Sequence, residues 1–195
     1  MADVVSGLED NPFDNKVRHQ GHTSSRANVQ LTTASPYLTT LTCAAAHAPS
    51  FPKHLAHQLG VGTNRALNKV ARFLAKTSDF QRAMLGTTTA VDVINGGVKV
   101  NALPEVVTSL VNFRIDFDES ISFAQEHVQA ILKKIAKKHD LEFIGFGSKG
   151  KEGGKFVKVE QLGEALEPAP RTPSEGPVWE LFAGTVKYVD IFSRG

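Results

Sequence analysis

Two polar side chains in the middle of the chain could bind a carboxylate. Arg114 lies in a run of alternating apolar and polar residues, and Asn101 follows the turn-like triplet Asn95-Gly96-Gly97. A guanidinium can hold a carboxylate with two parallel hydrogen bonds, and an asparagine amide can add a donor. The alternative is an ordinary strand with one solvent-exposed polar face. Spacing alone favours the exposed face and leaves carboxylate binding open.

Other patterns resemble chemical sites but are better explained as structure. Gly145-x-Gly147-x-x-Gly150 follows a predicted strand, as a dinucleotide-binding fingerprint does. That fingerprint requires a following helix whose N-terminus holds the pyrophosphate. Here another strand follows, which predicts a hairpin loop.

The histidines, the cysteine and the lysines also favour structural interpretations. His19-x-x-His22 and His54-x-x-His57 each lack the further ligands that a zinc site needs, so surface histidines are predicted. Cys43 lies among alanines, which predicts a small buried residue. The lysines of 133–158 have no aromatic residues interleaved for base stacking, which predicts a solvated face.

The composition excludes several classes of protein. The 195 residues are 41% hydrophobic and 22% charged, as in a globular domain. No run approaches the roughly 20 apolar residues of a membrane span. The net charge of +2 does not favour nucleic acid or a membrane as a partner. The start of the chain lacks the pattern of a signal peptide, so a soluble domain is expected and its compartment stays open.

Hydrophobic periodicity predicts the elements that position these residues. Helices are predicted at 2–9, 36–46, 64–84, 118–138 and from Pro177 onward. Strands are predicted at 87–94, 98–100, 106–117, 141–146 and 156–159, with a polar loop at 14–36. The Asn-Gly pair at 95–96 predicts a hairpin turn.

The longest strand is predicted to have one buried face and one polar face. Arg114 belongs to the polar face, opposite these apolar side chains: Val107, Val111, Phe113, Ile115 and Phe117. The order of strands and helices predicts an α+β fold, in which an antiparallel sheet carries helices on one face and extra helices flank it.

Four segments resemble the lid, or dimerisation, domain of zinc-dependent exopeptidases of the carboxypeptidase S type. They are TTTAVDVINGGVKVNALPEVVTSLVNFRI at 87–115, PYLTTLTCAAAHAPSFPKHL at 36–55, ALEPAPRTPSEGPVWELFAGTV at 165–186 and VVSGLEDNPF at 4–13. The resemblance implies a ferredoxin-like lid core at 63–162. It also implies that 1–62 holds the end of the first lid helix, the polar loop and a helical insertion, and that 163–195 is a partial return toward a catalytic domain.

The same resemblance implies a role for Asn101 and Arg114. In such lids, the Asn of a Gly-Gly-x-x-x-Asn-x-x-Pro motif and a strand Arg help to bind the substrate's carboxylate, and these two residues occupy the corresponding positions. In the complete enzyme, zinc-activated water would attack a peptide or acyl-amino-acid amide bond near a free carboxylate. A homodimer is expected.

The chain departs from the family in its metal ligands. The His-x-Asp and Glu-Glu sequences of the family are absent from it. We therefore expect a domain fragment with no catalytic residue, metal ligand or cofactor of its own, inactive by itself, while zinc belongs to the complete enzyme. The alternative is a non-catalytic interaction module that self-associates through its sheet edge or a helix face. Neither a nucleic-acid partner nor a membrane segment is expected, although complete relatives can be vacuolar or secretory.

Overall fold

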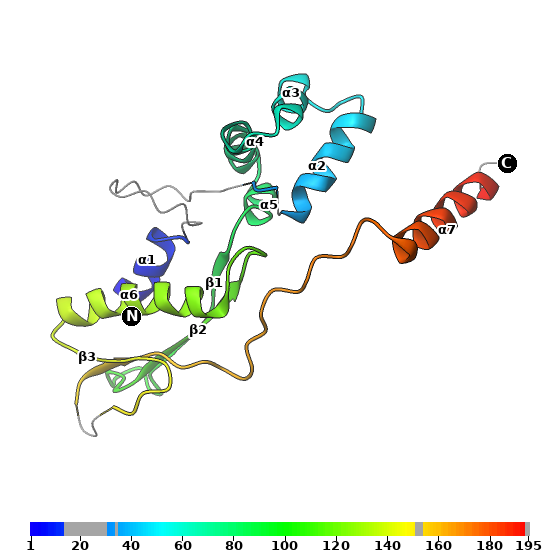
Figure 1. Cartoon of the computed structure of the whole chain (residues 1–195). Coiled ribbons are helices and arrows are strands. Elements are labelled where there is room, and N and C mark those ends of the chain that lie inside the picture. The colour runs from blue at the N-terminus through cyan, green and yellow to red at the C-terminus, as the bar shows by residue number, and fades with distance from the viewer. Residues whose placement is uncertain (14–30, 34, 151–153, 194–195) are drawn as a thin grey trace.

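The chain folds into a helical group, an α+β group and a C-terminal arm (Figure 1). The computed structural model describes residues 1–13, 31–33, 35–150 and 154–193. Most of the predicted polar loop at 14–36 therefore lies outside the described residues. The two groups have separate hydrophobic clusters, which share no residue. The α+β fold expected from the sequence is confirmed.

The helical group packs around one strongly amphipathic helix. It contains α2 (Pro36–His47), α3 (Lys53–Val61), α4 (Asn64–Thr77) and α5 (Asp79–Ala83). Thr63 caps α4, since its Oγ1 accepts a hydrogen bond of 3.3 Å from the Ala66 amide. The inner face of α4 is buried and consists of Ala66, Leu67, Val70, Ala71, Leu74 and Ala75. Burial of a whole helix face is what stabilises a group of such short helices.

Two features of this group differ from the prediction. The predicted helix at 64–84 is divided at Ser78, whose extended backbone separates α4 from α5. Helix α3 was not predicted, although its signals were present. Pro52 occupies its N-cap, and Gly62 ends it with a φ of +65° that suits glycine. Leu55 and Leu59 supply its buried face.

The α+β group is built on an antiparallel hairpin. Strand β1 (Thr88–Gly96) pairs with β2 (Val107–Arg114), from Thr88 opposite Arg114 to Gly96 opposite Val107, with a bulge between Val91 and Val93. Burial along β2 alternates residue by residue, as the sequence predicted. Val111, Phe113 and Ile115 pack into the cluster beneath the helices.

Two helices cover that buried face. Helix α6 (Ile121–Lys138) buries Ala124, Val128, Ile131, Leu132 and Ala136, and Ser120 caps it through the Phe123 amide. Helix α1 (Ala2–Asp10) contributes Leu8, and Phe13 follows it into the same cluster. The Phe13 ring meets the Phe113 ring edge to face, with the centroids 5.6 Å apart. Helices on one face of the sheet are therefore observed.

The turn predicted at Asn95-Gly96-Gly97 is wrong. Asn95 and Gly96 lie inside β1 and pair with Thr108 and Val107, so the connection is a loop at 97–106. A two-residue turn of the Asn-Gly type needs positive φ at both central positions. Asn95 lacks it, and Gly97 is the glycine here with positive φ, at +84°. The predicted strand at 98–100 does not form, and Val98 and Val100 are fully exposed.

The last two strands form their own small sheet. Strands β3 (Glu142–Ile144) and β4 (Phe156–Lys158) pair in parallel, with Glu142 opposite Phe156. The predicted hairpin loop between them is therefore a crossover, because the chain returns to the start of β3 before β4 begins. The ferredoxin-like arrangement implied by the resemblance would join all strands in one antiparallel sheet. The described strands instead form two separate pairs under α6.

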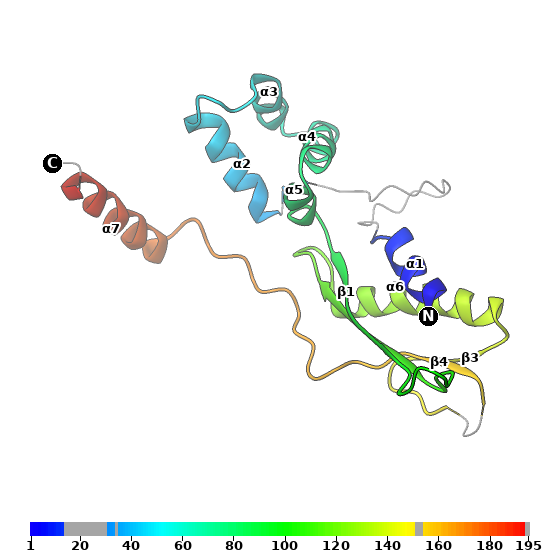
Figure 2. The ribbon, with the colours of Figure 1, turned by 180° about the vertical axis from the view of Figure 1, so that it is seen from behind.

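The C-terminal arm leaves the α+β group as an extended segment and ends in α7 (Pro177–Ser193), away from both groups (Figure 2). Several of its large apolar side chains are more than half exposed, among them Val178, Leu181 and Phe182. Among the described helices, none combines the length and apolar character needed to cross a bilayer. Phe117, predicted on the buried face, is 52% exposed because β2 ends at Arg114.

Candidate functional site

Arg114 stands at the end of β2 on the exposed face of the hairpin. Its neighbours Phe113 and Ile115 point into the core, so the guanidinium points to the other side. Among the described residues, Arg114 forms no ion pair and no hydrogen bond through its side chain. Within the described ranges, its donors are therefore available to a ligand.

A hydroxyl fixes the backbone around Arg114. The Asp116 amide donates a hydrogen bond of 2.9 Å to Thr87 Oγ1, and the Thr87 hydroxyl donates to a carboxylate oxygen of Glu119. Thr87 directly precedes Thr88, which is the strand partner of Arg114. These bonds tie the end of β2 to the start of β1, so Arg114 projects from a rigid position. A binding group held by a rigid scaffold needs little ordering when its ligand arrives.

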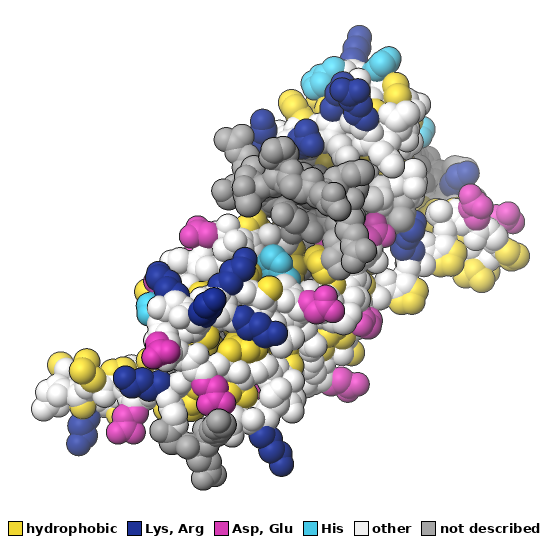
Figure 3. Space-filling model, turned by 60° about the vertical axis from the view of Figure 1, so that its left-hand side comes forward, with side chains coloured by type: hydrophobic (Ala, Val, Ile, Leu, Met, Phe, Trp, Pro, Cys, Tyr) yellow, Lys and Arg dark blue, Asp and Glu magenta, His cyan; other side chains and the backbone are white. Residues whose placement is uncertain are grey.

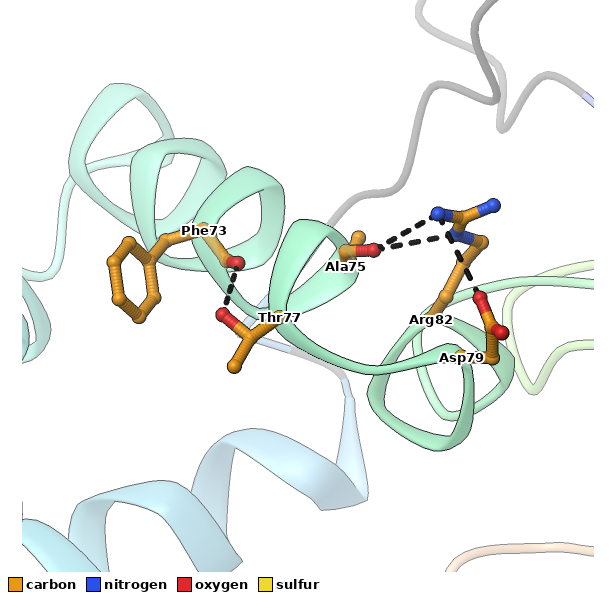
Figure 4. Close-up of polar contacts among 5 residues, drawn as sticks. All are labelled: Phe73, Ala75, Thr77, Asp79 and Arg82. Carbon is orange, nitrogen blue, oxygen red and sulfur yellow. Dashed lines mark hydrogen bonds and ion pairs between the residues drawn. The ribbon is translucent and has the colours of Figure 1, made fainter.

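The guanidinium of Arg82, in contrast, has partners within the chain. Its Nε and Nη2 donate to the Ala75 carbonyl at 3.2 and 3.1 Å, and Nη2 lies 3.8 Å from Asp79 Oδ1 (Figure 4). These bonds satisfy a carbonyl in the last turn of α4, where helices leave such groups without an intrahelical partner. Arg82 therefore serves structure, in contrast to Arg114.

Asn101 lies in the loop that connects the two strands. The loop turns on itself through a hydrogen bond of 3.4 Å from the Ala102 amide to the Lys99 carbonyl, and Asn101 is exposed within that turn. Val100 and Leu103 on either side are also exposed. The loop therefore presents a polar amide between apolar side chains at the tip of the hairpin.

The structure does not bring Asn101 and Arg114 together within one chain. Arg114 is the last residue of β2, and Asn101 precedes its first residue, Val107. A strand of that length spans about 24 Å at roughly 3.4 Å per residue. One small carboxylate therefore cannot contact both side chains of the same chain.

A pocket of about 230 Å³ opens elsewhere, between α6 and the glycine-containing segment after β3. Gln129 and Lys133 line it from α6, and Ser148 and Lys149 line it from that segment. The Lys133 ammonium lies 5.5 Å from the centre of the Phe143 ring. Glu142 also lines the pocket and offsets part of its positive charge. The next described element after these glycines is strand β4, whereas a dinucleotide fingerprint requires a helix.

The remaining candidates show no assembled site. His54 and His57 are exposed, and the His54 ring packs edge to face on Phe73, while His19 and His22 lie outside the described residues. Cys43 is exposed, which corrects the predicted buried residue. In its helix, α2, only Leu41 is fully buried, and half of the side chains are exposed. Within the described ranges, no three His, Cys, Asp or Glu side chains gather as metal ligands.

A charged cluster joins the first helix to the end of α6. Asp3 Oδ2 accepts hydrogen bonds from Lys138 Nζ at 2.6 Å and from His139 Nε2 at 2.8 Å. The bond from Lys138 is the largest of the influences that lower the pKa of Asp3 to about 2, and the bond from His139 adds to it. The cluster fixes α1 over α6 and lies far in sequence from Arg114.

Comparison with known proteins finds a peptidase dimerisation domain and relatives named as carboxypeptidases. Residues 51–140 match the family described as peptidase dimerisation domain. Carboxypeptidase S of Saccharomyces cerevisiae is 34% identical over 205 aligned residues, covering 100% of this chain and 31% of the yeast protein. A putative carboxypeptidase of the same yeast is 32% identical over 196 residues, covering 95% of this chain and 30% of that protein.

A more distant relative has a different name. An N-fatty-acyl-amino acid synthase/hydrolase of Danio rerio is 29% identical over 98 residues, covering 47% of this chain and 19% of that protein. The chain spans just under a third of the length of the two yeast relatives. No solved structure matches it significantly. The family match and the yeast relatives together identify the chain as a carboxypeptidase S-like peptidase dimerisation domain.

Proposed function

We propose that this domain pairs with a second copy of itself and presents Arg114 and Asn101 to the carboxylate of a substrate in the complete protein. That protein would hydrolyse a peptide bond or the amide bond of an N-acyl amino acid. The observation that carries the proposal is the guanidinium of Arg114, which is exposed on a rigid strand and has no ion-pair partner in the described part of the chain. A carboxylate is the ligand that matches its planar set of donors.

The hairpin supports pairing with a second copy. Within the described residues β1 pairs only with β2, so its other edge is free to add a strand. Apolar side chains on the far half of the hairpin are exposed, including Ile94 at 51% and Leu110 at 45%. Exposed apolar groups beside an unpaired strand edge favour association between chains.

Two copies would also resolve the separation of the two proposed binding residues. Asn101 and Arg114 of one chain are too far apart for one carboxylate, but a dimer can place Asn101 of one copy near Arg114 of the other. An interface that repeats the same surface on both subunits would then create two equivalent sites.

Zinc does not fit the residues described here. A catalytic zinc requires three protein ligands, and the described part of the chain assembles no such group. We therefore assign to this domain only the binding and orientation of the substrate, and we derive no hydrolytic step from it.

The alternative is a module that associates with its own copies and binds no substrate. The same free edge of β1 favours it. The two functions differ in Arg114, because a pure interaction module would not need an exposed guanidinium at the end of β2.

The dimer can be tested by light scattering on the purified chain during gel filtration. The wild-type chain should elute with the mass of a dimer. Ile94→Lys should give a monomer because it places a charge on the exposed apolar part of β1. Phe80→Lys is the matched control, since Phe80 is 69% exposed on α5 and the change adds the same charge outside the hairpin. A wild-type monomer, or equal effects of both variants, would contradict dimerisation through the hairpin.

A further inference from the structure

Positive charge is concentrated in the helical group. Residues 31–86 contain a single acidic residue, Asp79, which lies beside Arg82. The same stretch contains these further cations: Lys53, Arg65, Lys69, Arg72 and Lys76. The net charge of +2 for the whole chain therefore hides a strongly basic helical group and an acidic remainder. A charge asymmetry of this kind indicates an anionic partner for the basic part.

Four of these cations form a stripe along the outer face of α4, which we call the α4 basic stripe. Its members are Arg65, Lys69, Arg72 and Lys76, and all four are exposed. At 3.6 residues per turn, their spacing places them within an arc of about 60° and along about 16 Å of the helix. The opposite face of α4 is buried, so the stripe is held on a fixed ridge.

Among the residues that the structure describes, no acidic side chain pairs with the stripe. Helix α4 contains no Asp or Glu, and within the described part of the chain none of the four cations forms an ion pair. The side view shows basic and histidine side chains over this end of the molecule, without acidic ones among them (Figure 3). On α6, by contrast, Lys138 forms an ion pair with Asp3.

Two partly exposed apolar side chains lie close to the stripe in the sequence. Phe73 follows Arg72 and is 42% exposed, and Val61 at the end of α3 is 49% exposed. The His54 ring packs edge to face with Phe73, with the ring centroids 5.2 Å apart. Cations interleaved with half-exposed apolar groups match the interface of a bilayer, which accepts both kinds of side chain.

We propose that the α4 basic stripe binds the surface of an anionic phospholipid bilayer. The phosphate and carboxylate groups of the lipids would neutralise the four cations, and Phe73 and Val61 would enter the headgroup region. The contact is peripheral, because the apolar face of α4 is already buried in the protein. This function is independent of the substrate site, since α4 packs into one hydrophobic cluster and the neighbours of Arg114, Phe113 and Ile115, pack into the other.

The test is sedimentation of the full chain with phospholipid vesicles. Vesicles with about 30% phosphatidylserine in phosphatidylcholine are compared with pure phosphatidylcholine vesicles. The triple variant Arg65→Gln, Lys69→Gln, Arg72→Gln is compared with a matched control, Lys133→Gln, Lys134→Gln, Lys137→Gln on α6. Both variants remove three exposed cations from a helix, so the net charge of the chain falls equally.

The wild-type chain should bind only the vesicles with phosphatidylserine and should dissociate between about 0.1 M and about 0.5 M NaCl as screening increases. The α4 triple variant should bind on the order of 100-fold more weakly, at roughly five-fold per cation, while the α6 variant binds as the wild type does. Arg65→Lys with Arg72→Lys should retain binding, which separates loss of charge from loss of fold.

Three results would overturn the proposal. The first is an absence of wild-type binding to phosphatidylserine vesicles. The second is equal weakening by the α4 and α6 variants, which would show a response to net charge alone. The third is tighter binding to a DNA or RNA oligonucleotide than to the vesicles at the same salt concentration, which would assign the stripe to nucleic acid instead.

Discussion

Asn101 and Arg114 lie at opposite ends of one β-hairpin, separated by the length of β2. Arg114 pairs with Thr88 at the start of β1, and Asn101 lies in the loop beyond the pair of Gly96 and Val107. Two residues that the sequence suggests for one carboxylate are thus too far apart to share it within a chain. Co-expression of single variants of the complete protein can show whether Asn101 of one chain and Arg114 of another bind the same carboxylate.

In a complete relative carrying this domain, Asn101→Ala and Arg114→Ala should each lower kcat/KM for substrates that carry a free carboxylate. For Arg114→Ala, the loss of a charged partner predicts a fall in kcat/KM of about 30- to 5,000-fold. Co-expression of the two variants should restore part of the activity, because one site of the mixed dimer would contain both wild-type residues. Kinetics and the melting temperature of each purified species provide the measurement.

The control for this experiment is Arg114→Lys, which keeps the charge but loses the two-pronged hydrogen bonding. It should recover only part of the activity. The melting temperature should hardly change in any of these variants, since both residues are exposed. Mixed dimers as inactive as the separate variants would show that the residues do not share a site between chains.

Phe13 should be a main anchor of the α+β group. Its side chain is 5% exposed and packs against Phe113 and against the Phe123 ring at 6.0 Å. Phe13→Ala should lower the free energy of unfolding by about 3–5 kcal/mol, because it leaves a cavity between α6 and β2. Urea denaturation gives the measurement. Phe117→Ala, at a half-exposed position, should have a much smaller effect, and equal effects would refute the anchoring role.

The cluster of Asp3, Lys138 and His139 should make stability depend on acidity below about pH 4. The Lys138 bond lowers the pKa of Asp3 from 3.8 to about 2 in the folded state. A lowered folded-state pKa means that the stabilisation is complete above 3.8 and disappears as the pH falls through about 2. The wild type and Asp3→Asn should therefore differ in urea denaturation near neutral pH and converge near pH 2.

Asp10→Asn is the comparison variant, since it removes a carboxylate from the same helix without disturbing the cluster. The difference in free energy of unfolding between Asp10→Asn and the wild type should not disappear between pH 3.8 and about 2 in the way expected for Asp3→Asn. If the wild type and Asp3→Asn stay equally far apart down to about pH 2, the cluster does not act through the charge of Asp3.

Arg82 should stabilise the junction of α4 and α5. Arg82→Ala removes two hydrogen bonds to the Ala75 carbonyl and should cost about 1 kcal/mol, a small value because the side chain is partly exposed. Arg82→Lys should recover little of the lost stability, since an ammonium group cannot form the same forked pair of hydrogen bonds. Thermal melts measure both. Full recovery with lysine would show that only the charge matters.

The sequence alone was sufficient for the elements whose side chains repeat with a clear period. The buried stripe of α6 and the alternating faces of β2 follow directly from the spacing of apolar residues, and so does the placement of Arg114 on the exposed face. The resemblance to carboxypeptidase S-like lids also came from local segments, and the comparisons confirm it.

Tertiary structure decided how these elements pair. The Asn-Gly signal predicted a turn, but the register that buries Val111 and Phe113 under α6 continues β1 through Gly96. Likewise β4 pairs in parallel with β3, an arrangement that no local pattern indicates. A residue's own sequence neighbours determine which face it occupies, whereas strand register depends on contacts with segments far away in the chain. For this reason the sequence could suggest Asn101 and Arg114 as carboxylate-binding residues, but only the fold could show that they lie far apart within one chain.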